Sequence, residues 1–115
     1  MANTFKTITK ANVTSADIIY TVAGSTTTVL LGILLGNTTS GTITATVSLG
    51  SDTANRAGNN DEANQTVELI TGTSIPANSS LELLTGNKVV METTDTLSVT
   101  GSASTDVVLS IMEIT

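Results

Sequence analysis

The sequence predicts an all-β protein, an antiparallel β-sandwich of the jelly-roll or immunoglobulin-like kind. Roughly one residue in five is threonine, a β-branched residue that fits a pleated, half-exposed strand. Short apolar runs also recur at regular spacing between turns of Gly, Asn and Ser, which predicts about eight or nine short strands. No coiled-coil heptad, internal repeat or helix of ordinary length is visible. With 115 residues, one proline and no linker-like tract, we expect a single domain over residues 1–115.

The run at residues 29–37, VLLGILLGN, is the only one that is apolar on both faces without interruption as far as Asn37. We therefore expect a strand buried on both sides, with the other strands arranged around it. The run is too short to cross a bilayer, which needs about 20 apolar residues. Gly32 and Gly36 within it would tolerate a bulge or the close approach of another backbone.

Residues 4–10 alternate weakly and predict an edge strand or an N-terminal arm within residues 1–12. Phe5 and Ile8 are candidates for docking, while Lys6 and Lys10 would discourage edge-to-edge pairing. A frayed terminus and an arm exchanged with a neighbouring subunit are both open alternatives.

Further strands are predicted at residues 17–22, 42–49, 66–70, 81–84, 88–92, 96–100 and 107–114. In the first of these, Ile18, Tyr20 and Val22 should share one face. In residues 42–49 every second residue from Ile43 to Leu49 is apolar and should face inward, with Thr or Ser between them.

The last predicted strand, residues 107–114, is apolar on both faces for most of its length. We expect it beside the strand at 29–37 or beneath a neighbouring subunit. The candidate interface residues are Phe5, Ile8, Ile111, Met112 and Ile114.

Composition and charge exclude several kinds of partner. The formal net charge is −6, and the basic residues are only Lys6, Lys10, Arg56 and Lys88. So few cations argue against binding a nucleic-acid backbone, and no basic amphipathic stretch suggests a membrane surface. Without cysteine there are no disulfides or thiolate metal sites. The first residues lack the features of a secretory signal, so we expect the chain in the cytoplasm unless it leaves as part of a particle.

Catalytic constellations are missing from the sequence. Histidine and cysteine are both absent, which removes the usual base and the usual thiol nucleophile, and no motif supports a pairing of Lys88 with a serine. The strand acids are expected on solvent faces, because each sits beside inward-facing apolar residues: Glu68, Glu82, Glu92, Asp95 and Glu113. We therefore expect no enzymatic activity and no cofactor.

The long loop at residues 50–64 contains the only candidate metal ligands. Asp52, Asp61 and Glu62 supply carboxylates that would suit Ca²⁺, beside several asparagines. Their spacing does not match the EF-hand pattern, and such residues are ordinary in loops. The loop therefore predicts no specific metal site, although calcium stays open.

Several segments together carry a family likeness. They are IPANSSLEL (75–83), GNKVVM (86–91), DTLSV (95–99), DVVLSIMEI (106–114) and VLLGILLGNT (29–38). In this order of strands and turns the chain resembles the small virion proteins of tailed bacteriophages, including those infecting marine cyanobacteria. The resemblance covers most of the chain outside the loop at 50–64, and it implies a β-sandwich subunit of the particle with no catalytic residues.

These observations lead to one functional hypothesis and two alternatives. We expect a non-enzymatic structural protein of a phage virion, a capsid decoration or cement protein that binds the shell as a homo-oligomer. Its partners would be the major capsid protein or other virion proteins, with no nucleic acid or membrane, and it would assemble in the host bacterial cytoplasm. The alternatives are a neck, tail or baseplate ring subunit, and a module that binds glycans or proteins through the long loop.

Overall fold

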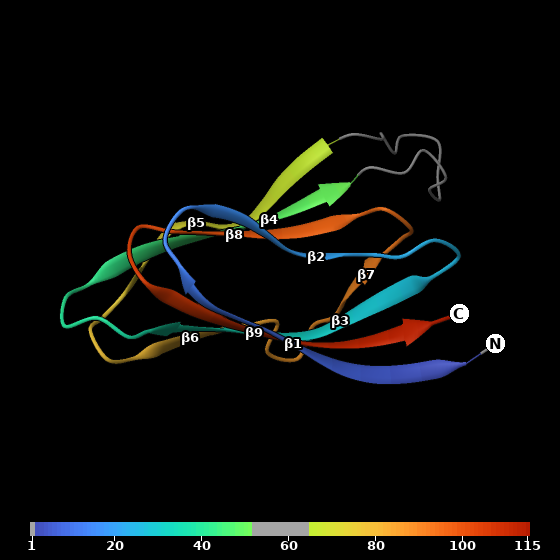
Figure 1. The fold of residues 1–115 in the computed structure, drawn as a ribbon, viewed down its shortest axis with the longest axis horizontal. Coiled ribbons are helices and arrows are strands. Elements are labelled where there is room, and N and C mark those ends of the chain that lie inside the picture. The colour runs from blue at the N-terminus through green and yellow to red at the C-terminus, as the bar shows by residue number, and fades with distance from the viewer. Residues whose placement is uncertain (1, 52–64) are drawn as a thin grey trace.

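A computed structural model describes residues 2–51 and 65–115 and confirms the all-β prediction. Within these residues nine strands form two antiparallel sheets that pack face to face (Figure 1). The strands are β1 (Asn3–Val13), β2 (Ala16–Thr21), β3 (Thr27–Asn37), β4 (Ile43–Ser51), β5 (Gln65–Ile75), β6 (Ser80–Leu83), β7 (Val89–Met91), β8 (Thr96–Gly101) and β9 (Thr105–Ile114).

The strand order is that of a jelly roll. Sheet A has the order β1-β9-β3-β6, with β7 also paired to β3, and sheet B has the order β2-β8-β4-β5. The chain thus pairs as one long hairpin, β1 with β9, β2 with β8, β3 with β6 and β7, and β4 with β5. This hairpin wraps around so that β9 lies beside β3 and β8 beside β4. Of the two sandwich types left open by the sequence, this is the jelly roll.

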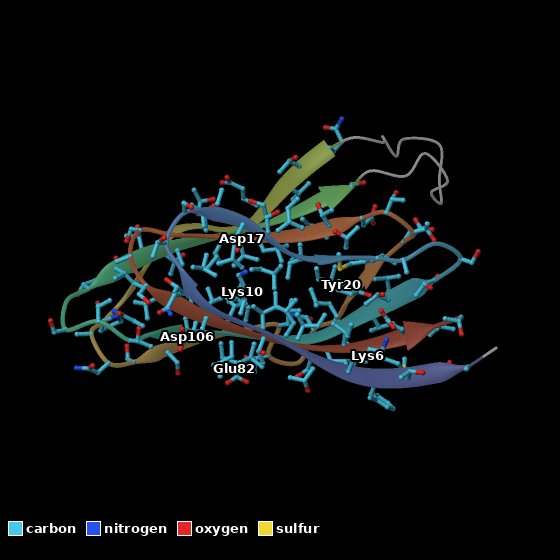
Figure 2. All side chains as sticks on the ribbon, in the orientation of Figure 1. Lys6, Lys10, Asp17, Tyr20, Glu82 and Asp106 are labelled. Atoms are coloured by element: carbon cyan, nitrogen blue, oxygen red, sulfur yellow. The ribbon has the colours of Figure 1, made fainter. Side chains whose placement is uncertain are left out.

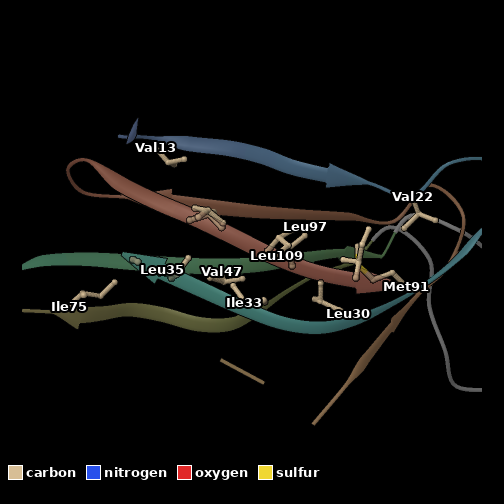
Figure 3. Packing of buried hydrophobic residues seen from close by; sticks show 14 of the residues in the cluster. Val13, Val22, Leu30, Ile33, Leu35, Val47, Ile75, Met91, Leu97 and Leu109 are labelled. Carbon is tan, nitrogen blue, oxygen red and sulfur yellow. The ribbon is translucent and has the colours of Figure 1, made fainter. Parts of the chain in front are cut away.

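The core lies between the two sheets and is almost entirely aliphatic (Figure 3). Strand β4 shows the expected alternation, because Ile43, Ala45 and Val47 are buried while Thr44 between them is exposed. Strand β9 lies beside β3, which was one of the two positions that the sequence predicted for it. Its residues Val107, Leu109 and Ile111 all face the core.

Burial of β3 on both sides was predicted, and this prediction is wrong for the single chain. Leu30, Ile33 and Leu35 are fully buried, but Leu34 is 40% exposed on the opposite face. A two-layer sandwich has no third layer to cover that face. The register with β9 also shifts between Leu30 and Gly32, so β3 carries a bulge in the middle of its apolar run.

Strand β2 contains a second bulge that corrects the predicted face of Ile18. The register with β8 shifts between Ile18 and Tyr20, and this places Ile18 on the outer face of sheet B with 60% of its surface exposed. Tyr20 points between the sheets (Figure 2) and Val22 is buried, so those two residues face the interior as expected. The extra residue of the bulge is why simple alternation fails here.

A buried asparagine anchors the turn after β3. The side-chain amide of Asn37 donates hydrogen bonds to the carbonyl oxygens of Gly41 (2.9 Å), Ile75 (2.9 Å) and Pro76 (3.0 Å). Its Oδ1 accepts a hydrogen bond from the backbone N–H of Thr39 at 2.8 Å. Asn37 thereby fixes the end of β3 to the corner that joins β5 to β6.

Candidate interaction surface

The outer face of sheet A carries an apolar row that crosses four strands. Register pairs join Phe5 to Met112, Met112 to Val29, and Val29 to Val90. Residues paired in this way project to the same side of a sheet, so these side chains stand next to one another. Phe5 is 72% exposed and Val90 57% exposed, while the other two are partly buried. We call this row the first ridge.

A second, shorter apolar row lies further along the same strands. Val108 of β9 pairs with Leu34 of β3, and Leu34 pairs in turn with Glu82 of β6. We call Val108 and Leu34 the second ridge. Figure 2 shows Glu82 on the side of sheet A that is turned away from sheet B.

Small residues separate the two ridges. Ser110 pairs with Thr7 on one side and with Gly32 on the other, and we call these three residues the trough. A shallow cavity of about 260 Å³ lies here, and its lining includes Gly32, Ser110, Leu34, Val108 and Glu82. A Cβ atom added at Gly32 would meet nothing within 4 Å, so the trough is open above its backbone.

The outer face of sheet B is different in character. Its central strands present hydroxyl side chains, and register pairs join Thr46 to Thr100 and Ser48 to Ser98. Ile18 is an exposed apolar residue on this face, beside Ser98. The hydroxyl face is well suited to water, whereas the ridges of sheet A leave large apolar side chains uncovered.

Between the sheets, a polar cluster ties β1 and β2 to β9. Lys6 Nζ lies 2.7 Å from Glu113 Oε1, and the Tyr20 hydroxyl donates to Glu113 Oε2 at 2.6 Å. The Tyr20 hydroxyl also lies 2.7 Å from Thr28 Oγ1. Figure 2 shows Lys6 and Tyr20 directed toward each other between the two layers. We call these four residues the Glu113 cluster.

The contacts in this cluster shift two pKa values. Hydrogen bonds from Lys6 and then from Tyr20 hold the pKa of Glu113 below its usual value. Burial, followed by the hydrogen bond to Glu113, raises the pKa of Tyr20 to about 12. At neutral pH the cluster is therefore a carboxylate held between an ammonium group and a phenol, an arrangement that joins strands.

The sequence placed Glu113 and Asp95 on solvent faces, and the structure corrects both. Glu113 lies two residues after Ile111 on β9, so its side chain faces the interior of the sandwich, as that of Ile111 does. Asp95 is fully buried in the turn before β8, where its carboxylate accepts a hydrogen bond from the backbone N–H of Glu92 at 3.0 Å.

The candidate interface residues fall into two groups. Phe5 and Met112 are neighbours on the first ridge, and Ile114 lies on the same outer face of sheet A, partly buried. Ile111 is instead a core residue that is only 1% exposed, and Ile8 faces inward and packs against the core. These two side chains are therefore directed away from any partner of the outer face.

Sequence reasoning missed four members of this surface as individual site residues: Val29, Leu34, Val90 and Val108. The pairing register places Val29 beside Met112 and Val90, and it places Leu34 beside Val108. Local alternation does not reveal that register.

The calcium candidates Asp52, Asp61 and Glu62 lie outside the described residues. In residues 2–51 and 65–115, no group of three or more acidic, histidine or cysteine side chains is placed to hold a metal ion. The same two segments contain no helix that is long and apolar enough to span a membrane.

Comparisons with known proteins identify no family. No protein-family model and no curated protein matches the chain. A solved structure of Bacillus endospore appendages, described as disulfide-linked pili, is 19% identical with a TM-score of 0.49, and the match covers 99% of this chain and 87% of that one. The T13 viral particle of IBDV is 14% identical with a TM-score of 0.30, covering 98% of this chain and 39% of that one. Likeness at this level does not extend to function.

Proposed function

We propose that this chain is a non-enzymatic structural subunit that assembles with other subunits through the outer face of sheet A. One observation carries the proposal, the contrast between the two outer faces of the sandwich. Sheet A presents two apolar ridges with Phe5, Val90 and Leu34 exposed, whereas the central strands of sheet B present hydroxyls. Contiguous apolar patches on soluble proteins are typical of interaction sites.

Within this class we propose a place in the virion of a tailed phage, as a decoration or cement protein bound to the major capsid protein. The resemblance of the strand and turn segments to small phage virion proteins supports this choice. The lack of histidine and cysteine in the sequence supports a role without catalysis. A neck, tail or baseplate ring is the alternative position for the same kind of subunit.

The copy number of the chain in purified virions of the phage that encodes it tests this proposal. Quantitative mass spectrometry against the major capsid protein would give the number directly. On symmetry grounds, hundreds of copies indicate the icosahedral shell, and roughly six to a few dozen indicate a ring. Absence from the virion would overturn the virion proposal.

A further inference from the structure

We propose that two copies of this chain pack face to face through the outer faces of sheet A, related by a two-fold axis. In this dimer the first ridge of each copy lies in the trough of the other. The inference rests on the proposed role as an assembling subunit, and it names both the surface and the partner, a second copy.

The shape of the face is self-complementary. On β1 and β9 the first ridge and the trough lie on alternate residues, so the two rows are about 7 Å apart. Consider a two-fold axis in the plane of the interface, parallel to the ridge and midway between ridge and trough. Rotation about this axis places each ridge over the trough of the other copy, so one operation makes both contacts. The bare backbone at Gly32 gives the incoming apolar side chains room.

The charges on this face favour the same arrangement. The chain has a net charge of −6, so two copies repel each other unless their acidic groups are kept apart. The residues of the first ridge and of the trough are uncharged, and the one acid that lines the cavity at the trough is Glu82. Within the strands of sheet A, the acids on this face are Glu82, beside the second ridge, and Asp106, which pairs with Gly36 further along.

The two-fold axis also separates these acids. It reverses the strand direction between the copies, so Glu82 and Asp106 of one copy lie at the opposite end of the interface from those of the other. In Figure 2 Asp106 lies toward one end of the sandwich and Lys6 toward the other, with Glu82 between them on the Asp106 side. An uncharged ridge, with the acids of the two copies on opposite sides of the axis, fits a second acidic copy better than a basic partner, which would need acids near the centre.

Two substitutions test the interface without touching the core. Gly32→Val fills the trough with a residue that suits a strand, and nothing lies within 4 Å of the added Cβ. Phe5→Glu places a charge on the first ridge, at a side chain that is mostly exposed in the single chain. Ile18→Glu is the matched control, because it changes a similarly exposed apolar side chain on the outer face of sheet B.

Sedimentation equilibrium of the full chain would measure the dimer. At about 100 μM, where a dimer with a micromolar Kd is mostly formed, we expect twice the 11.7 kDa mass of the chain. Gly32→Val and Phe5→Glu should each weaken the dimer at least about tenfold, or 1.4 kcal/mol, while Ile18→Glu leaves Kd unchanged. Far-UV circular dichroism should give the same strand signal for all four proteins. If Gly32→Val does not fold, Phe5→Glu decides the test.

A monomeric wild-type chain at this concentration would overturn the dimer, as would equal weakening by Ile18→Glu. These outcomes are separable from the virion proposal. A monomer that is abundant in virions overturns the dimer alone, and a dimer that is absent from virions overturns the virion role alone.

Discussion

The chain has one tyrosine and no tryptophan, so the ionisation of Tyr20 reports directly on the Glu113 cluster. In the folded protein we expect Tyr20 to ionise with a pKa of about 12, above its ordinary value of 10.0. Burial is the first cause and the hydrogen bond to Glu113 is the second. The substitution Glu113→Gln keeps the size of the side chain and removes its charge. The pKa of Tyr20 should therefore fall, yet stay above 10.0, because burial persists.

The same substitution should lower the free energy of unfolding at neutral pH by about 1–2 kcal/mol. Hydrogen bonds to charged groups contribute roughly 1.5–3 kcal/mol, and exposed ion pairs at most about 1 kcal/mol. The Glu113 side chain is 14% exposed and that of Lys6 is 53% exposed, so the Lys6 pair is partly screened and the total lies toward the low end. Lys6 can turn to solvent in the variant, so no buried charge is left behind.

The stability difference between wild type and Glu113→Gln should depend on pH with a definite sign. The pKa of Glu113 is lower in the folded state than its ordinary value of 4.5. The folded state then binds fewer protons than the unfolded state, so the stabilisation is complete above pH 4.5 and is lost as the pH falls through the folded pKa. For Tyr20 the pKa is raised, so its stabilisation is complete below pH 10.0 and is lost as the pH rises toward 12.

Absorbance titration of the phenolate, with circular dichroism at each pH to confirm the fold, measures the pKa of Tyr20. Urea unfolding at pH 7 and at pH 3 measures the stability of both proteins. The control is Glu82→Gln, which removes an exposed carboxylate from the outer face of sheet A and should leave the pKa of Tyr20 unchanged. A folded wild-type chain whose tyrosine titrates near 10, or equal values for wild type and Glu113→Gln, would refute the cluster.

Four further substitutions test the fold. Leu35→Ala should lower the free energy of unfolding in urea by about 2–5 kcal/mol, because Leu35 is fully buried. Leu34→Ala should lower it by under about 1 kcal/mol at concentrations where the chain is monomeric, because Leu34 is partly exposed. Equal costs would contradict the assigned faces. Asn37→Ala should cost about 2–4 kcal/mol, since three carbonyl oxygens lose their donor, and an unchanged unfolding midpoint would show that the turn does not need it. Gly101→Ala should lower Tm sharply, because the added Cβ would lie 2.6 Å from the carbonyl oxygen of Val13. A normal Tm would show that the backbone there can move.

The sequence predicted well wherever one face of a strand is polar. In β4 the alternation of Thr and Ser with Ile43, Ala45 and Val47 distinguishes the two faces, and the structure agrees. The fold class followed from such strands and from the turns between them. The jelly-roll order did not, because the pairing of β1 with β9 joins opposite ends of the chain, and no local pattern encodes it.

Bulges account for another group of differences between the side-chain faces that the sequence predicted and those in the structure. The extra residue between Ile18 and Tyr20, and the one between Leu30 and Gly32, each invert the alternation for the rest of the strand. Gly32 is a local signal for the bulge in β3, because a glycine within a strand tolerates a bulge, whereas no glycine marks the bulge in β2. Glu113 was misplaced for a related reason, since Val108 and Met112 made both faces of β9 look equally apolar.

The apolar character of β3 and β9 on both faces exceeds what one two-layer sandwich needs. Leu30, Ile33 and Leu35 complete the core on the inner face, so Val29 and Leu34 add nothing to it. In the proposed dimer a second sheet A would cover this outer face, and both strands would then be buried on both sides, as their sequences suggested. The difference between the burial predicted for β3 and its burial in the single chain is therefore informative. A strand's apolar pattern reflects burial in the assembled state as well as in the subunit.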